Sequence, residues 1–554
     1  MRRLVAIIIA AWVSISASAA QSTQHETLHL HQRPSGRVTA HFAFAQSVAQ
    51  SQAHALDDIA RGFGIDEMAL SFTQGTRCDS IATKVGCRPP GVVLWAWMRN
   101  NHSLSSVDTR WSALTNALAG TFCASLNFIT PENSAEPQSS FTHSSVNSSL
   151  SSLRYASLPR EITCTENLTP WSKLLPCSTK VNHLAHIKDR KMKPYCILGS
   201  KAGIASLFNA YAIYDADYHS MSVEVSRKCT SDTECTTEIR QDLVVALDPV
   251  RKGYQRNMDW SLQFLFGKEV AGSCPLNEIE TNILVTLPKA EGFEFEGKVK
   301  PVYNDEKNAW VYSLELAKQF SMGVKYSDSK PDLSEKSKST ELIQIHRHLT
   351  GYGRERGGIK IRISNRDTKP RTVTLLEVLP WFIKLYMHTL QRTTYHITSQ
   401  EVLSLSGEVV NQTLKYQPAI PRIRPSVIEL TATLPGESIT VFTFQFDRAF
   451  IKYTEHPPDA NRGFDTGAAI LTVHPASRTE KEYRLFSDVL LIALPTPDFS
   501  MPYNVITMSC TIVALYFGTV FNLIVKKLEG LDDSQLKKKW WMFWVKERSV
   551  LGKK

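Results

Sequence analysis

An apolar segment near the C-terminus sets the strongest limit on how this chain can fold. Residues 505–525 include no charged side chain and are mostly apolar. At about 1.5 Å per residue, a helix of this length spans the roughly 30 Å hydrocarbon core of a bilayer. Lys526 and Lys527 follow directly, and the positive-inside rule assigns such a basic flank to the cytosol. The sequence therefore predicts a juxtamembrane neck and transmembrane helix over residues 498–525 and a basic cytosolic tail over residues 526–554.

The N-terminus predicts entry into the secretory pathway. Arg2 and Arg3 precede an apolar run over residues 4–13, and small residues follow as far as Ala20. This order is typical of a cleaved signal peptide, and the apolar run is too short to cross a bilayer. We therefore expect residues 1–20 to be a signal peptide and the body of the chain to be lumenal, held by one C-terminal span.

The predicted span contains more polar side chains than a simple anchor requires. They are Thr507, Ser509, Thr511, Thr519 and Asn522. Such groups contact neighbouring helices in many membrane proteins, and other membrane helices are one partner that we expect. Tolerance of a few hydroxyls in an isolated span is the alternative, and the sequence favours neither.

The charge distribution excludes a nucleic-acid-binding surface. The chain has 554 residues and a formal net charge of +10. Arg2, Arg3 and a surplus of five positive charges after residue 525 account for most of it, which leaves about +3 for the large middle. No nucleic-acid partner is therefore expected.

Nine of the ten cysteines precede the span and would face an oxidising compartment. Cys229 and Cys235 are predicted to form a local disulfide, as are Cys78 with Cys87, because no second Cys/His pair at zinc-ligand spacing accompanies them. The odd number leaves at least one cysteine free or bonded to another chain. The same region carries four N-x-Ser/Thr glycosylation sequons, at Asn101, Asn147, Asn167 and Asn411.

Alternation of apolar and polar residues predicts a mainly β fold. It is clear at residues 38–44, 359–363, 428–434 and 442–446, with turn residues such as Pro435-Gly436 and Gly357-Gly358 between strands. Helical periodicity occurs mainly at 56–63 and 111–118, and residues 134–152 are predicted to be a solvated Ser-rich loop. We expect a mixed α/β lumenal domain over 21–275 and a β-sandwich-like lumenal domain over 276–497.

The sequence shows no convincing catalytic or metal site. Ser200 is not centred in a Gly-x-Ser-x-Gly nucleophile elbow. The glycine-rich segment 351–357 precedes a predicted strand, so a hairpin loop is a better interpretation than a phosphate-binding loop. His29 with His31, and His346 with His348, lack a third ligand at convincing spacing. Neither a catalytic residue nor a cofactor or metal is expected.

Several segments in the same order resemble the PIG-T family, the large non-catalytic subunit of the glycosylphosphatidylinositol (GPI) transamidase of the endoplasmic reticulum. They are SFTQG at 71–75, FCASLNFI at 122–129, LPRE at 158–161, CTENLTPW at 164–171, LLPC at 174–177, GYG at 351–353, PW at 380–381, LYMHTL at 385–390, PDANRGF at 458–464 and LPTPDFSMPYN at 494–504. The resemblance covers essentially the whole chain.

The resemblance implies a subunit that supports a separate cysteine-protease-like catalytic subunit. In the family an intermolecular disulfide joins the two, and its cysteine corresponds to Cys164 here. Pairing of Cys164 with Cys177 is the alternative. Other membrane subunits, the GPI glycolipid and the precursor protein are the further partners that the resemblance implies.

The resemblance also implies contacts with the GPI glycan. Asn461, Asp498, Ser500 and Asn504 match family positions where polar and amide side chains suit carbohydrate recognition. The alternative is that prolines make a stiff neck here and the polar groups only cap it.

One departure from the family is residues 181–200, which look like an insertion and bring Cys196. Without it the lumenal cysteines would number eight, and the odd count would no longer support a bond to another chain.

A free-standing membrane-anchored lumenal lectin or chaperone is the competing function, and a secretory hydrolase with an unrecognised site is a third.

Overall fold

The computed structural model describes residues 24–49, 54–75, 87–100, 106–143, 151–175, 203–229, 235–250, 258–271, 281–288, 292–314, 319–327, 342–351, 353, 355–397, 402–404, 413–457, 459–475, 480–497 and 500–526. The chain divides into two compact units. One comprises Met1–Ile451 and Pro457–Pro495, and the other Lys452–His456 and Thr496–Lys554. The predicted signal peptide and cytosolic tail lie outside the described residues, apart from Lys526.

Within the described ranges, an eleven-stranded sheet organises the N-terminal part of the first unit. Its neighbouring strands are antiparallel except for the pair β1 and β10. In spatial order they are β12 (Val302–Asn304), β13 (Ala309–Ser313), β10 (Asn282–Thr286), β1 (Gln24–Gln32), β2 (Val38–Ala49), β8 (Cys235–Leu247), β7 (Tyr218–Cys229), β3 (Ile65–Gln74), β4 (Gly91–Arg99), β6 (Ser151–Leu158) and β5 (Ser134–Ala135).

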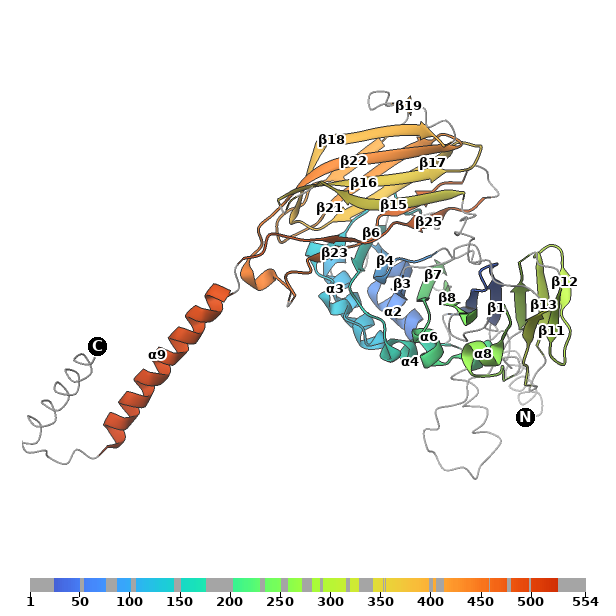
Figure 1. Cartoon of the computed structure of the whole chain (residues 1–554), viewed down its shortest axis with the longest axis horizontal. Coiled ribbons are helices and arrows are strands. Elements are labelled where there is room, and N and C mark those ends of the chain that lie inside the picture. The colour runs from blue at the N-terminus through green and yellow to red at the C-terminus, as the bar shows by residue number, and fades with distance from the viewer. Residues whose placement is uncertain are drawn as a thin grey trace, which may run out of the picture. The chain divides into compact units, whose positions relative to one another are not determined.

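Helices cover one face of this sheet (Figure 1). They are α2 (Ala55–Phe63), α3 (Val107–Phe122), α4 (Thr165–Lys173), α6 (Ala210–Tyr214) and α8 (Leu262–Phe266), with short 3-10 turns η2 (Leu126–Phe128), η3 (Pro131–Asn133) and η5 (Gly203–Leu207). The period-two pattern of β2 turns Phe42 and Phe44 into this core, where both pack edge-on against Phe208. Trp171 of α4 is fully buried there. The predicted helices at 56–63 and 111–118 are confirmed.

A β-sandwich forms the C-terminal part of the first unit, as the sequence predicts. One sheet holds β15 (Ile343–Thr350), β16 (Arg356–Asn365), β22 (Ser438–Arg448), β18 (Ile383–His396) and β19 (Val402–Ser404); the other holds β20 (Thr413–Gln417), β21 (Ser426–Leu434), β17 (Arg371–Leu379), β24 (Ile470–Val473) and β25 (Tyr483–Phe486). Alternate residues of the facing strands form its core, as with Ile361, Leu375 and Phe442.

The predicted domain boundary at residue 275 is wrong. Strands β10, β12 and β13 complete the first sheet, and β14 (Gly323–Tyr326) joins β11 (Phe293–Glu296) and β9 (Trp260–Ser261) in a small sheet beside it. Tyr312 and Tyr326 are buried in the first core. The first domain therefore extends to Tyr326, and the sandwich begins at Ile343.

The two domains meet through a shared apolar layer and one buried carboxylate. Val93 and Tyr155 from the first sheet pack with Leu376 and Ile470 from the sandwich. Glu429 of β21 is 3% exposed and accepts backbone N–H bonds from residues 138, 139 and 140 at 2.8–2.9 Å. The prediction of a solvated loop over 134–152 is wrong at its ends, where Ser134–Ala135 forms β5 and β6 begins at Ser151, and at Ser140, which is buried.

Gly357 and Gly358 lie inside β16, not in a turn between strands as predicted. A Cβ at Gly357 would lie 2.8 Å from the ring of Phe446, so the position excludes larger side chains for a packing reason. The hairpin loop predicted at 351–357 is shorter than expected, because β15 ends at Thr350 and its antiparallel partner β16 begins at Arg356.

The second unit contains η6 (Tyr453–Glu455) and α9 (Ser500–Val525). The stretch Tyr503–Val525 has a mean hydropathy of 1.9, and α9 is the one helix in the described ranges that is long and apolar enough to cross a membrane. The hydroxyls of Thr507, Thr511 and Thr519 donate to carbonyls one turn earlier in α9. Those three groups therefore need no partner helix.

Two short strands, β23 (Phe464–Thr466) and β26 (Leu490–Ile492), pair in the first unit.

Candidate functional site

Cys164 lies at the start of α4, at a fixed point on the surface of the first domain. Its backbone is extended, with φ −139° and ψ 175°, and its carbonyl accepts the first N–H bonds of the helix from Asn167 and Leu168. The side chain is exposed and carries a free thiol. An exposed thiol on an anchored backbone suits a bond to another chain, because little ordering of the residue is needed when the bond forms.

Asn167 fixes this helix start. Its Oδ1 accepts the backbone N–H of Cys164 at 2.8 Å, and its Nδ2 donates to the carbonyls of Phe122 and Cys123, both at 3.0 Å. Asn167 is 3% exposed. The amide that would carry the predicted glycan at Asn167 is buried between α3 and α4 in this fold, and glycosylation of this residue stays a prediction.

Two aromatic groups support the segment from beneath. The hydroxyl of Tyr214 donates to the carbonyl of Cys164, and its ring contacts the edge of His219 with centroids 4.9 Å apart. Burial raises the pKa of Tyr214, and the neighbouring Cys164 raises it further. Burial lowers the pKa of His219 to about 4, so its ring is neutral at pH 7. Its Nε2 lies 2.7 Å from Oγ1 of Thr163.

Exposed apolar side chains lie on the segments around Cys164. Ile162 is 73% exposed, Tyr211 on α6 is 80% exposed and Phe128 is 66% exposed. A hydrogen bond from the Ser125 backbone to Glu161 holds the turn that precedes Phe128 against the Cys164 segment. We call Phe128, Ile162, Cys164 and Tyr211 the Cys164 patch. Exposed large apolar groups around a reactive group are typical of a protein-binding surface.

Cys123 is a second exposed free thiol, which the sequence did not single out. It ends α3 in the left-handed region, with φ 52° and ψ 45°, and its carbonyl accepts from Asn167. Phe128 and Tyr211 were also missed. Neither their isolated positions in the chain nor their residue types indicate exposure, which comes from how η2 and α6 pack.

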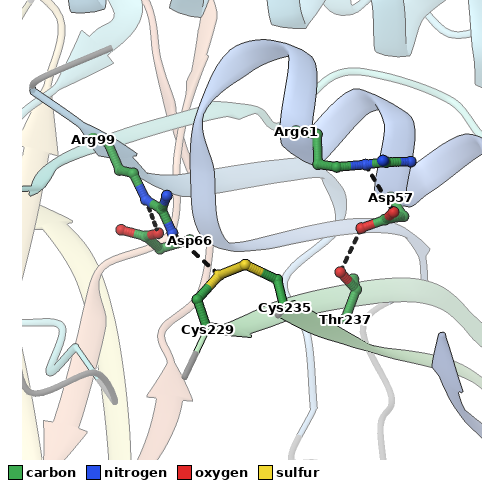
Figure 2. Close-up of a disulfide and its surroundings, with 7 residues drawn as sticks. All are labelled: Asp57, Arg61, Asp66, Arg99, Cys229, Cys235 and Thr237. Atoms are coloured by element: carbon green, nitrogen blue, oxygen red, sulfur yellow. Dashed lines mark hydrogen bonds and ion pairs between the residues drawn. A yellow bond between two sulfur atoms is a disulfide. The ribbon is translucent and has the colours of Figure 1, made fainter. Parts of the chain in front are cut away.

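The predicted disulfide between Cys229 and Cys235 is confirmed. Figure 2 shows it at the end of the β7–β8 pair, near the ion pair between Arg99 and Asp66. Cys87 is also disulfide-bonded. Cys78, Cys177 and Cys196 lie outside the described residues, as do the sequons at Asn101, Asn147 and Asn411.

The predicted glycolipid contacts fall in both units. Asn461 is exposed on the loop before β23, in the first unit, and Asn504 is exposed near the start of α9, in the second. Ser500 is the first residue of α9, and Asp498 lies outside the described residues.

One histidine of each pair has an ordinary hydrogen-bond partner. His29 Nε2 lies 2.9 Å from Thr286 Oγ1, and His346 lies 3.4 Å from Asp488. In the part of the chain that the structure describes, no three His, Cys, Asp or Glu side chains come together as a metal site would require.

The fold and site together define a large β-rich protein with an exposed thiol and, within the described ranges, one helix that is long and apolar enough to cross a membrane. The sequence model of the family described as "Gpi16 subunit, GPI transamidase component" matches residues 6–186, 198–259 and 249–548. The unmatched residues 187–197 fall inside the segment that the sequence suggested as an insertion. The chain belongs to this family, and the resemblance to PIG-T is confirmed.

Known relatives match along nearly the whole chain. The mouse protein "GPI-anchor transamidase component PIGT" is 31% identical over 95% of this chain and 93% of its own length, and the human protein of the same name is 31% identical over 92% and 91%. The Saccharomyces cerevisiae "GPI transamidase component GPI16" is 28% identical over 80% of this chain and 75% of its own. A solved exo-β-N-acetylglucosaminidase of Vibrio harveyi matches 29% of this chain at 12% identity, with a TM-score of 0.17, too low to carry an argument about fold.

Proposed function

We propose that this chain is a non-catalytic subunit of the GPI transamidase complex. It stabilises a separate cysteine-protease-like catalytic subunit and helps to present the GPI glycolipid while anchors are attached to the C-termini of precursor proteins. Family membership supports the complex. The observation that carries the proposal is the free, exposed thiol of Cys164 at a fixed helix start among exposed apolar side chains.

Cys164 is the proposed site of a disulfide with the catalytic subunit. The bond would use a surface that is already ordered, because Asn167 and Tyr214 hold the backbone of Cys164 in place. Phe128, Ile162 and Tyr211 would then be covered by the partner, which removes apolar area from water at about 25 cal/mol per Å². A disulfide with Cys177 is the competing pairing.

Cys164 is assigned to tethering and not to catalysis because its surroundings suit that role. Its Sγ lies 3.5 Å from Oδ1 of Asn167, a group that cannot act as a base. The nearby His219 is neutral and engaged by Thr163. A catalytic cysteine needs a base or cation that lowers its pKa.

Presentation of the glycolipid is assigned to Asn461, Asp498, Ser500 and Asn504. The side chains of Asn461 and Asn504 are exposed, and their amides can donate to and accept from sugar hydroxyls. Asn504 lies within the first helical turns of the apolar stretch that begins at Tyr503, a level at which a lipid headgroup meets the bilayer. A lone membrane-anchored lectin or chaperone is less favoured, because the relatives are components of a complex.

The proposed location is the membrane of the endoplasmic reticulum, with the ectodomain lumenal and the C-terminus cytosolic. A signal peptide over residues 1–20, glycans at Asn101, Asn147 and Asn411, and contacts of α9 with other membrane subunits belong to the same proposal.

Non-reducing electrophoresis of the complex, purified through this chain, tests the proposal. We expect a band equal in mass to this chain plus a protease-sized partner, absent in Cys164→Ser and retained in Cys123→Ser, the matched exposed thiol. A band of this chain alone from wild-type complex would refute the Cys164 link. Loss of transamidation on Asn461→Ala or Asn504→Ala, with assembly intact, would support the glycolipid contacts, and full activity would refute them.

A further inference from the structure

A concave site lies between the two domains of the first unit, apart from the Cys164 patch. It is a cavity of about 470 Å³, within the roughly 300–1,000 Å³ range of small-ligand sites. One face of α3 lines it with Asp108, Trp111, Ser112 and Asn116, and the turns after α3 add Asn127 and Thr130. Segment 417–427 of the sandwich closes it on the other side.

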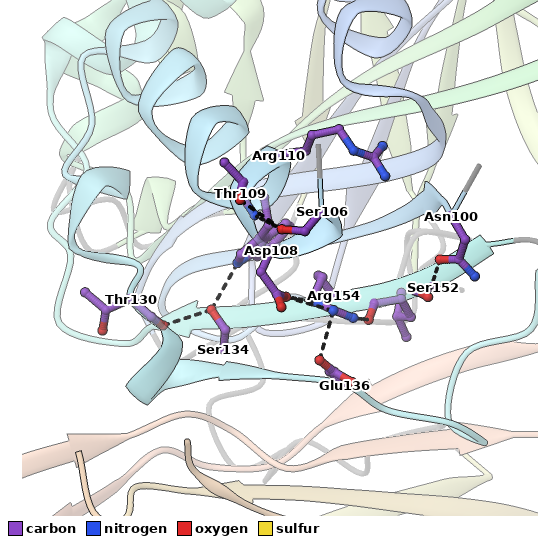
Figure 3. A network of polar contacts seen from close by, with 12 residues as sticks. Asn100, Ser106, Asp108, Thr109, Arg110, Thr130, Ser134, Glu136, Ser152 and Arg154 are labelled. Atoms are coloured by element: carbon purple, nitrogen blue, oxygen red, sulfur yellow. Dashed lines mark hydrogen bonds and ion pairs between the residues drawn. The ribbon is translucent and has the colours of Figure 1, made fainter. Parts of the chain in front are cut away.

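Arg154 of β6 organises the polar side of this cleft. Its Nη2 lies 2.8 Å from Asp108 and 2.9 Å from Glu136, so one guanidinium holds two carboxylates (Figure 3). The arginine side chain is 9% exposed, whereas Asp108 is 76% and Glu136 is 54% exposed. The carboxylates therefore have fixed positions and still face solvent, which preorganises them for a ligand.

The charges of the cleft cancel. Asp108 and Glu136 are opposed by Arg154 and Arg424, which are the charged side chains in its lining. A neutral ligand is therefore favoured over an anionic or cationic one. The other polar groups are side-chain amides and hydroxyls, such as Asn116, which is exposed.

We infer that this cleft binds a neutral oligosaccharide. Each sugar hydroxyl donates one hydrogen bond and accepts others, so it is matched by carboxylates, amides and a guanidinium placed close together. Ile423, which is 57% exposed, supplies apolar surface for the C–H faces of sugar rings. A peptide would need a free strand edge, which α3 does not offer. The edge strands β5 and β20 contribute Ser134 and Gln417 to the lining, so a peptide is the occupant against which the glycan is tested. The inference is independent of the Cys164 link.

Glycan binding by the purified full-length protein in detergent tests this inference. The probe is an array of neutral glycans, including high-mannose N-glycans and the neutral mannose arm of the GPI core, with sialylated glycans and a neutral nonapeptide as comparators. We expect saturable binding of neutral glycans only. Which of the two kinds of neutral glycan binds then shows whether the natural ligand is an N-glycan or a GPI glycan. The double variant Asn116→Ala/Asn127→Ala should weaken binding at least tenfold, because it removes two amides from the cleft lining. Both side chains are exposed, so the substitutions should leave the fold intact.

Gln445→Ala is the matched control, since it removes an exposed amide from β22, away from the cleft lining, and should leave binding unchanged. Cys164→Ser should also bind normally, which separates this test from that of the tether. The inference is overturned if no neutral glycan binds, if the double variant binds as wild type does, or if the sialylated glycans or the peptide bind equally well.

Discussion

Replacing Glu429 by alanine should loosen the joint between the two domains. Glu429 is buried, and its carboxylate accepts three backbone N–H bonds at 2.8–2.9 Å and the hydroxyl of Ser140 at 2.6 Å. Removing it leaves the buried N–H and hydroxyl of Ser140, and the part-buried N–H groups of residues 138 and 139, without this acceptor. Each buried donor costs about 1–3 kcal/mol when unpaired. Water that enters the emptied site would pair with some of these donors and reduce the cost. We therefore expect a loss of about 3–5 kcal/mol in the free energy of unfolding.

The measurement is denaturant unfolding of the full chain in detergent, followed by tryptophan fluorescence, together with amide hydrogen exchange. Residues 138–140 should lose protection in Glu429→Ala, because their N–H groups donate to this carboxylate. Glu294→Ala is the control, since that residue is exposed on β11 and should change stability by less than about 0.5 kcal/mol. Equal stability of the two variants, with residues 138–140 still protected, would refute the role given to Glu429.

Three further predictions concern the first domain. His31 and His219 have pKa values lowered by burial to about 4, so the unfolded chain binds more protons between pH 4 and 6.5, and stability should fall as the pH falls from 6.5 to 4. His219→Gln should reduce the slope by up to about 1.4 kcal/mol per pH unit in a pH series of unfolding curves, and an unchanged slope would contradict this. Asn167→Gln should leave the glycan mass of the secretory-expressed protein unchanged in intact-mass measurement, because Asn167 is buried; a loss equal to one glycan would show the burial to be wrong. Trp171→Ala should cost about 3–5 kcal/mol, because the side chain is fully buried and its Nε1 donates to the carbonyl of Ser222. A change below 1 kcal/mol in denaturant unfolding would rule out that packing.

Local sequence patterns were sufficient to predict four of the strands (β2, β16, β21 and β22), the helices α2 and α3, and the apolar helix α9. The alternation at 38–44 and 359–363 depends only on which side of a strand is buried, so it survives without knowledge of partners. The domain boundary was not predictable in this way. Strand β10 pairs with β1, more than 200 residues earlier, and only that long-range pairing assigns it to the first domain.

The candidate site around Cys164 was predicted only in part, again because some of its features depend on contacts between distant parts of the chain. Cys164 was chosen because a family motif contains it, but burial of the sequon at Asn167 depends on contacts with the end of α3. A sequon indicates chemistry at the residue and carries no information on burial. Cys123 and Tyr211 have no motif that marks them as exposed. Glu429 is one of 53 acidic residues in the sequence, and its hydrogen-bond partners lie about 290 residues away, so no local pattern singles it out.

Disulfide mapping of the native complex tests the central claim most directly. The complex is alkylated and digested without reduction, and peptides are identified by mass spectrometry. We predict a peptide containing Cys164 joined to a peptide of the catalytic subunit, with Cys123 alkylated as a free thiol. Recovery of Cys164 as an alkylated thiol, or joined to Cys177 of the same chain, would contradict the account.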